Sequence, residues 1–181
     1  MEQDTDDSVI VGVHSVYEAL RSAQRRVQRL HVSRGSMPEK VRQIVEMANA
    51  GGIPIRREGR DALDRIARGV LHQGVVAIAG ARSYVPFERF LESEKPLIVV
   101  LDGVQDPQNL GAVIRTAETA GATGLVVTER RSVGLTSVVS RVSAGALEYL
   151  PIAQVSNLVA AINAMKTKGL WVVAVDQNAP D

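Results

Sequence analysis

The segment LIVVLDGVQDPQNLGAVIRTA, residues 97–117, carries the clearest structural pattern of the chain. Its first five residues are aliphatic without interruption, which is typical of a parallel strand covered on both faces. A tight turn around Gly103 and Pro107 follows, and a helix is predicted from about Gln108 to Ala120. A buried strand that leads directly into a helix predicts an α/β fold.

Strands and helices alternate along the rest of the chain as well. Residues 83–96, with two prolines and mixed charge, interrupt this alternation and are interpreted as a linker. We therefore predict two α/β units, residues 8–82 and residues 97–181, the second built on a parallel sheet. The expected strands lie at residues 9–13, 29–33, 53–56, 74–79, 97–101, 125–127, 149–153 and 170–175. The expected helices lie at residues 15–23 (with Ser15 as N-cap), 38–50, 61–67, 108–120, 137–147 and 157–168.

The composition excludes several kinds of site. Because it lacks cysteine, the 181-residue chain has no disulfide, no thiolate zinc site and no cysteine nucleophile. Only three histidines are present and none are closely spaced, so we expect no metal centre. No apolar run approaches the roughly 20 residues of a membrane span, and the acidic residues 1–8 resemble neither a signal nor a transit peptide. We expect a soluble, cytoplasmic protein with no membrane partner.

Basic residues are concentrated in the first unit. Residues 8–82 contain twelve arginines and one lysine against six acidic residues, a net charge of +7, whereas residues 97–181 carry −1. Because arginine binds phosphates with two N–H groups and stacks on bases, this imbalance predicts that the first unit binds a polyanion. A solvated basic face is the alternative that charge alone leaves open.

Asn109 and Arg115 are the candidate chemical residues of the quoted segment. Asn109 lies near the helix start, where free N–H groups favour anions, and Gly111 allows another backbone or a ligand to approach closely. Arg115 lies among apolar residues, so its guanidinium requires a carboxylate or phosphate partner. An ion pair with Asp102 or Asp106 is the structural alternative. No Gly-x-Gly-x-x-Gly or Gly-x-x-x-x-Gly-Lys motif follows a strand, which excludes the common dinucleotide and P-loop sites.

Four residues of the segment resemble in their spacing the first signature of the SpoU/TrmH family of RNA ribose 2′-O-methyltransferases, within the SPOUT superfamily: Asn109, Gly111, Arg115 and Ala117. Three further segments extend the resemblance over most of the chain: GVHSVYEAL at residues 12–20, HQGV at residues 72–75 and SAGA at residues 143–146. The first two are similar to the ends of the family's small substrate-binding domain. Together the four segments resemble most closely the members that methylate a guanosine ribose in 23S rRNA.

The resemblance implies a fold, a reaction and a site. The fold is a small α/β RNA-substrate-binding domain followed by a parallel-sheet SPOUT methyltransferase domain of the trefoil-knot type. The reaction is methyl transfer from S-adenosylmethionine to a ribose 2′-hydroxyl, with RNA as partner, a homodimer as assembly and no metal. Asn109 and Arg115 are the implied catalytic residues. Since an arginine stays protonated, we interpret Arg115 as an electrostatic clamp on the target nucleotide, which Asn109 helps to orient, rather than as a general base.

Eight residues are candidates for RNA contact. Paired arginines on an RNA enzyme are candidates for phosphate contact. His72 and Gln73 belong to a matched segment, although a packed turn histidine and a residue that simply opens a strand are the alternatives. The full set is Arg25, Arg26, Arg56, Arg57, His72, Gln73, Arg130 and Arg131.

Two signatures that the family carries after its last strand, a Gly-Ser/Ala-Glu-Gly-type loop and a Ser-Leu-Asn-Val-Ser segment, do not occur in the sequence up to Asp181. In the family these segments form the knot and most cofactor contacts. We therefore expect a methyltransferase domain truncated before the knot, cofactor contacts beyond Asp181, and no activity of these 181 residues alone. The alternative function is a non-catalytic RNA-binding or ribosome-assembly module with a degenerate methyltransferase domain.

Overall fold

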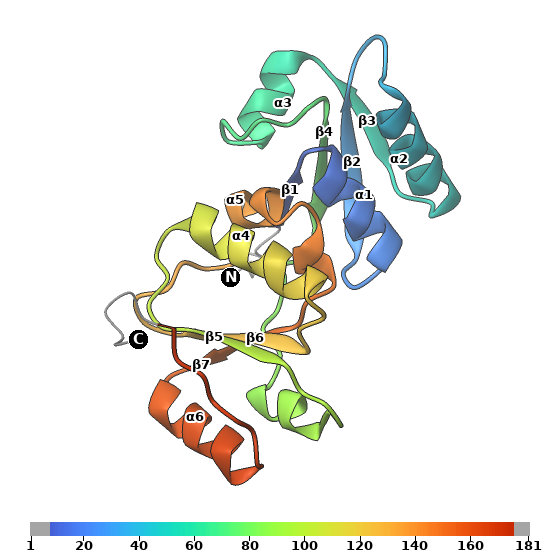
Figure 1. Ribbon diagram of the computed structural model, residues 1–181. Coiled ribbons are helices and arrows are strands. Elements are labelled where there is room, and N and C mark those ends of the chain that lie inside the picture. Colours follow the sequence, from blue (N-terminus) through green and yellow to red (C-terminus); the bar gives the residue numbers. More distant parts are fainter. Residues whose placement is uncertain (1–7, 176–181) are drawn as a thin grey trace, which may run out of the picture.

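The computed structural model describes residues 8–175 and contains two β-sheets, each with its own helices (Figure 1). The first sheet is built from residues 8–79 and the second from residues 98–155. The predicted α/β class, with a parallel sheet in the second half, is therefore confirmed. The acidic N-terminal residues, for which we predict no leader peptide, lie outside the described residues.

The first sheet has four strands in the order β1-β4-β2-β3 and is mixed. β4 pairs antiparallel with β1 and with β2, and β2 pairs parallel with β3. In chain order the elements of this unit are β1 (Ser8–Val11), α1 (Val13–Ser22), β2 (Val27–Ser33), α2 (Glu39–Ala50), β3 (Ile55–Glu58), α3 (Arg60–Ile66) and β4 (Val75–Ala79).

Successive residues of β4 fill two apolar layers on opposite faces of the first sheet. Val75, Ala77 and Ala79 lie in the larger layer, together with buried residues of α1 and α2. Val76 lies in the smaller layer, together with Leu63 of α3. This division follows from the pleat of a strand, whose successive side chains point to opposite faces. Two helices therefore cover one face, and α3 covers part of the other.

The second sheet has three parallel strands in the order β5-β6-β7. The helices α4 and α5 and the 3-10 helix η2 pack on one face, and the 3-10 helix η1 and α6 pack on the other (Figure 1). In chain order the elements are η1 (Phe87–Glu92), β5 (Ile98–Leu101), α4 (Pro107–Thr119), β6 (Gly124–Thr128), α5 (Ser137–Val142), η2 (Ala146–Glu148), β7 (Ile152–Val155) and α6 (Leu158–Thr167).

The segment between the two sheets packs against the second one. Phe90 of η1 is 1% exposed and forms an apolar cluster with Val126, Ala153 and Met165. The residue at position 124 has to be glycine, because a Cβ there would overlap the Phe90 ring. Part of the segment interpreted as a linker thus contributes to the core of the second unit.

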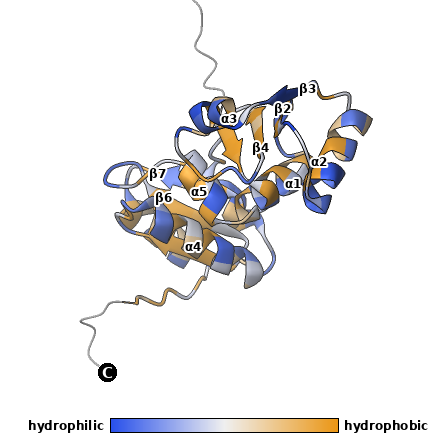
Figure 2. Ribbon diagram, turned by 90° about the horizontal axis from the view of Figure 1, so that it is seen from above, coloured by the Kyte–Doolittle hydropathy of each residue, from blue (hydrophilic) through white to orange (hydrophobic). Residues whose placement is uncertain are grey.

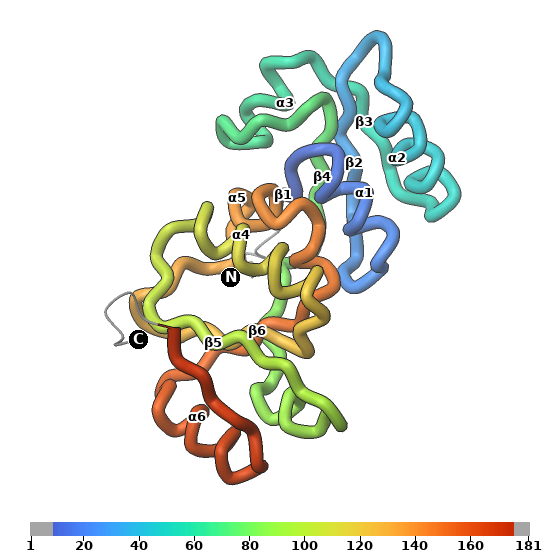
Figure 3. The backbone as a smooth tube through the Cα atoms, viewed as in Figure 1, coloured from blue at the N-terminus to red at the C-terminus, as the bar shows by residue number. Residues whose placement is uncertain are grey.

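The predicted strand at residues 170–175 is wrong. The chain reverses its direction after α6 (Figure 3), but residues 170–175 form no strand. Trp171 and Val175 are 96% and 98% exposed, and the apolar segment leads away from the folded part (Figure 2). An aliphatic run becomes a strand only where a neighbouring strand completes its backbone hydrogen bonds, and no strand between residues 8 and 175 pairs with this one.

Within the same range, no helix has both the length and the apolar character needed to cross a membrane. The described residues also contain no group of three or more histidine, aspartate or glutamate side chains that could hold a metal ion.

Candidate active site at the junction of the two units

α4 begins at Pro107, one residue before the predicted start at about Gln108. Asp106 caps the helix, since its Oδ1 accepts a hydrogen bond of 2.9 Å from the Gln108 N–H. Pro107 occupies the first turn, where its missing N–H leaves no hydrogen bond unmade. Asn109 is therefore held in the first turn of α4, exposed, shortly after the carboxyl end of β5.

Gly111 allows α4 and α5 to pack in close contact. A Cβ at this position would lie 2.6 Å from the Val142 Cβ and 3.1 Å from the Val139 carbonyl oxygen, both in α5. Any larger residue would force the two helices apart, because protein interiors are close-packed. The close approach that Gly111 permits is thus between two helices of this chain.

Arg115 is exposed on α4 and lines an open cavity of about 710 Å³. The alternative of a structural ion pair with Asp102 or Asp106 is not realised, since no ion pair to Arg115 forms within the described residues. A charged guanidinium that faces a cavity without a carboxylate partner can bind a phosphate or another anionic group.

Asn109 and Arg115 are not brought together. Six helical residues separate them by about 9 Å along the axis and about 120° around it. The cavity is lined by Arg115 but not by Asn109. The two side chains of the signature therefore face different surroundings in this structure.

Both units line the cavity beside Arg115. The first unit contributes three residues of α1, while α4 and the loop between α5 and β7 contribute the rest. Two arginines and two glutamates are among the lining residues, so the cavity is polar without a net charge. The lining consists of Glu18, Arg21, Ser22, Arg115, Glu118, Thr119, Ser143, Ala144, Gly145, Ala146 and Tyr149.

A hydrogen bond between the two units joins two residues that line this cavity. The Tyr149 hydroxyl donates to the Glu18 Oε2 at 2.5 Å, and Arg21 lies 3.8 Å from the same carboxylate. Desolvation, together with the hydrogen bond and the negative charge of Glu18, raises the pKa of Tyr149 to about 12. The hydroxyl therefore stays protonated at neutral pH and remains a donor to Glu18.

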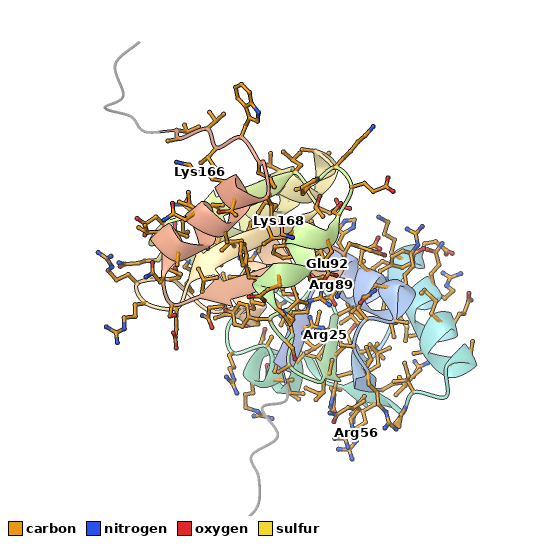
Figure 4. All side chains as sticks on the ribbon, turned by 90° about the horizontal axis from the view of Figure 1, so that it is seen from below. Arg25, Arg56, Arg89, Glu92, Lys166 and Lys168 are labelled. Atoms are coloured by element: carbon orange, nitrogen blue, oxygen red, sulfur yellow. The ribbon has the colours of Figure 1, made fainter. Side chains whose placement is uncertain are left out.

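A buried ion pair joins the two units next to the cavity. Arg25, just after α1, donates from Nε and Nη2 to the two carboxylate oxygens of Glu148 at 3.1 and 2.5 Å. The side chains are 7% and 0% exposed, and Arg25 lies between the units in Figure 4. The predicted phosphate contact at Arg25 is therefore wrong, because its guanidinium is committed to Glu148. The pKa of nearby Arg82 is lowered from its ordinary value, because the effect of burial exceeds the opposing effect of the Glu148 charge.

The same interface explains the position of Ser15. α1 begins at Val13, so Ser15 is not the N-cap but lies buried inside the helix. Its hydroxyl donates to the Ser140 carbonyl oxygen of α5 at 3.0 Å. Gly145 contributes as well, because a Cβ there would collide with the Glu18 side chain at 2.5 Å. The matched segments at residues 12–20 and 143–146 are thus packed against each other.

His72 and Gln73 have structural partners. The Nδ1 of His72, which is 8% exposed, accepts from the Gly74 N–H at 2.9 Å, so its Nε2 carries the proton toward Asp64 at 3.1 Å. The Gln73 Oε1 accepts from the Val13 N–H at 3.3 Å, at the start of α1. The contacts therefore support the alternative of a packed turn histidine. The predicted RNA contact at His72 is wrong, because both ring nitrogens have partners within the protein.

The remaining candidates for RNA contact are exposed. Arg56 and Arg57 lie on β3, at the edge of the first sheet, and Arg26 precedes β2. Arg130 and Arg131 follow the carboxyl end of β6. These five guanidiniums do not form a single cluster, since they are distributed over both units.

Sequence reasoning missed Glu18, Tyr149 and Glu148. Glu18 lies within the matched segment 12–20, and the other two follow the matched segment 143–146, so their neighbourhoods carried a signal. The contacts themselves join residues 123 and 131 positions apart, which no local pattern reveals.

Comparison with known proteins agrees with this two-unit organisation. Residues 9–85 match the family model for RNA 2′-O ribose methyltransferase substrate binding. Residues 96–181 match the model for the SpoU rRNA methylase family. The boundary between the two matches falls within the segment that joins the two sheets.

Similar proteins occur in several bacteria. A Bacillus subtilis (strain 168) protein assigned to the TrmH family of tRNA/rRNA methyltransferases is 37% identical over 175 residues, which are 94% of this chain and 70% of that protein. A Staphylococcus haemolyticus protein of the same description is 34% identical over 97% of this chain and 72% of its own length. An AdoMet-bound rRNA methyltransferase from Sinorhizobium meliloti has a TM-score of 0.72 at 27% identity, with 91% of this chain and 60% of that one covered. The chain thus spans about 60% of the length of that solved structure.

Proposed function

The chain belongs to the SpoU rRNA methylase family, and we therefore propose that it serves in methylation of a ribose 2′-hydroxyl of rRNA or tRNA, with S-adenosylmethionine as the methyl donor. The observation that carries the proposal is the cavity at Arg115, because the substrate-binding unit and the methylase unit both line it. An RNA held by the first unit is thereby presented to a free guanidinium of the second.

Arg115 acts on the RNA in this proposal. A 2′-hydroxyl is a poor nucleophile, and negative charge develops on its oxygen as the proton leaves and the bond to the methyl carbon forms. A fixed guanidinium stabilises that charge or aligns the neighbouring phosphate. Because an arginine stays protonated, the proton passes to water or phosphate. Asn109, exposed in the first turn of α4, contacts the ribose or the backbone from another direction.

The methyl donor supplies an electrophilic methyl group when it is bound. In open α/β sheets, ligands bind outside the carboxyl ends of the strands. That edge is open to solvent, since Asp102, Glu129 and Arg130 are exposed there. Residues 171–175 are exposed as well and do not cover a cofactor site. The described residues therefore do not enclose the cofactor. In this proposal their role is to bind and orient the RNA.

Three finer assignments belong to the same proposal. The four matched segments favour a guanosine of 23S rRNA as the target, a homodimer as the active assembly and the cytoplasm as the location. Mapping of 2′-O-methylated positions in rRNA from cells with and without the gene tests the target, and light scattering of the purified protein tests the assembly.

The reaction is tested with the intact protein, S-adenosylmethionine labelled in the methyl group, and unmodified rRNA and tRNA as separate substrates. We expect label in one RNA class for the wild-type protein and at least about a hundredfold less for Arg115→Ala. RNA binding without any label in either class would contradict the proposal and support the non-catalytic RNA-binding module instead.

A further inference from the structure

The two neighbouring arginines of β3 point to opposite faces of the first sheet. β2 and β3 are parallel partners, with Leu30 opposite Ile55, His31 opposite Arg56 and Val32 opposite Arg57. Leu30 and Val32 belong to the apolar layer under α1 and α2. Paired residues of adjacent strands share a face, so Arg57 lies on the helix-covered side, whereas Arg56 lies on the other side.

Arg29 lies on the same face as Arg56. Arg29 is two residues before His31 in β2, so the two side chains share a face. Its partner in β4 is Ile78, which is next to Ala77, and Ala77 lies in the apolar layer on the helix-covered face. Arg29 and Arg56 are both exposed. The rise of a strand and the distance between strands separate their Cα atoms by about 8 Å, so each guanidinium can reach a different phosphate of one nucleic-acid strand.

α3 approaches β2 but leaves Arg29 and Arg56 of this half exposed. The buried contacts of α3 are with Val11 of β1 and Val76 of β4, which are the other two strands of the sheet. The half formed by β2 and β3 is instead polar. Between the two arginines, His31 is 6% exposed and its Nδ1 lies 3.3 Å from the Glu58 Oε1.

The acidic groups next to this half are engaged within the protein. Glu58 contacts His31, and Asp64 of α3 contacts the Nε2 of His72 at 3.1 Å. The two exposed arginines are therefore not paired with the carboxylates that lie closest to them in the sheet. Within a unit whose net charge is +7, a phosphate can approach this surface without first displacing an ion pair to Arg29 or Arg56.

We propose that the β2–β3 half of this sheet face, with Arg29 and Arg56, is the surface on which the first unit docks the phosphate backbone of RNA. The inference rests on the proposed function, which supplies RNA as the partner. β2 and β3 contain no phenylalanine, tyrosine or tryptophan, so bases have no exposed ring on which to stack. Recognition here is by charge and backbone geometry, without preference for sequence.

The surface controls RNA affinity and not methyl transfer. Arg56 lies at the outer rim of the first unit, on the side away from the second unit (Figure 4), whereas Arg115 lies at the junction of the two. Loss of the two arginines is therefore expected to raise KM for RNA and to leave kcat unchanged.

The test measures binding of the purified 181-residue chain to a fluorescent single-stranded RNA and to an RNA hairpin, at several salt concentrations. Arg29→Gln/Arg56→Gln is expected to weaken binding about tenfold at low salt and to reduce the slope of log K against log salt by about 1.4 for the single strand. Lys40→Gln/Arg42→Gln, at two exposed positions of α2, also removes two positive charges and is the charge-matched control. Arg57→Gln is expected to weaken binding less than Arg56→Gln.

Each other result has a definite meaning. Equal losses for Arg56→Gln and Arg57→Gln would overturn the assignment to one face, and an unchanged affinity of the double variant would overturn the surface altogether. A wild-type chain that binds neither RNA at low salt would overturn both this surface and the RNA-binding part of the proposed function. Thermal unfolding of each variant shows that the fold is retained, which is expected because both side chains are exposed.

Discussion

Arg25 and Glu148 form a two-pronged ion pair across the junction of the two units, with both side chains withdrawn from solvent. One partner follows α1 of the substrate-binding unit, and the other lies in η2 of the methylase unit. Their contact holds the first unit against the helices that surround Arg115, so the position of the first unit relative to the candidate active site depends on this pair.

Removal of one partner of this pair is expected to be strongly destabilising. Arg25→Met leaves Glu148 as an uncompensated buried charge, which costs about 3–5 kcal/mol in the free energy of unfolding. Denaturant unfolding measures the loss. Arg26→Met, at the exposed neighbouring position, is the matched control and is expected to change stability by less than about 0.5 kcal/mol. The double variant Arg25→Met/Glu148→Leu should be more stable than Arg25→Met alone, and a further loss would contradict this account.

Substitution of Gly111 is expected to disturb the packing of α4 on α5. Gly111→Ala introduces a Cβ only 2.6 Å from the Val142 Cβ, and such overpacking costs about 1–3 kcal/mol. Gly134→Ala is the control, because a Cβ at Gly134 meets no atom within 4 Å. Melting temperatures of the two variants give the comparison. Equal melting temperatures would show that the glycine of the signature is not required for helix packing.

The stability of the junction is expected to decrease at high pH through Tyr149. Its pKa in the folded protein is about 12, above the value of about 10 for an unfolded chain. The contribution of the protonated hydroxyl is therefore fully present below pH 10 and is lost as the pH rises toward 12. Absorbance titration of phenolate detects this late ionisation. Glu18→Gln removes the carboxylate that favours the protonated form and should lower the pKa of Tyr149. Tyr149→Phe should remove the contribution of Tyr149 and leave that of Tyr84, whose pKa burial also raises.

Local patterns predicted most elements, because the information for them lies within short segments. The aliphatic runs 97–101 and 125–127 became β5 and β6, and α4 begins one residue before its predicted start at about Gln108. The site was less predictable. Arg25 belongs to an arginine pair that resembles a phosphate contact, and only the fold reveals that a glutamate 123 residues later occupies it.

The segment 170–175 illustrates the opposite limit. Its aliphatic residues have the composition of a strand, but strand formation also requires a partner with free backbone groups, which lies outside the segment's own sequence. The prediction was correct about propensity and wrong about structure for that reason. In the first unit, the alternation of side chains along β3 shows that Arg56 and Arg57 point to opposite faces. Only the register with β2 shows which of the two lies on the side away from α1 and α2.

Trp171 is expected to report directly on this segment. It is the only tryptophan of the chain and is 96% exposed, so its fluorescence in the 181-residue protein should match that of free tryptophan in water and be fully accessible to acrylamide. Addition of S-adenosylmethionine is expected to leave the spectrum unchanged and to give no heat in calorimetric titration, because the described residues do not enclose the cofactor. Protected fluorescence, or micromolar binding, would contradict this.

Arg115 is expected to be dispensable for folding and essential for chemistry. Its side chain is exposed and makes no ion pair within the described residues, so Arg115→Ala should change the melting temperature little. In the intact protein the same substitution should lower methylation by more than the roughly hundredfold effect of one electrostatic contact.

Arg115→Lys keeps the charge but not the planar two-pronged geometry, and an activity between that of wild type and Arg115→Ala is expected if the guanidinium clamps a phosphate. The control is Arg21→Gln, since Arg21 lines the same cavity on the opposite unit: it should affect RNA affinity without the full loss of turnover. A large drop in melting temperature for Arg115→Ala, in parallel with the loss of activity, would instead assign Arg115 a structural role.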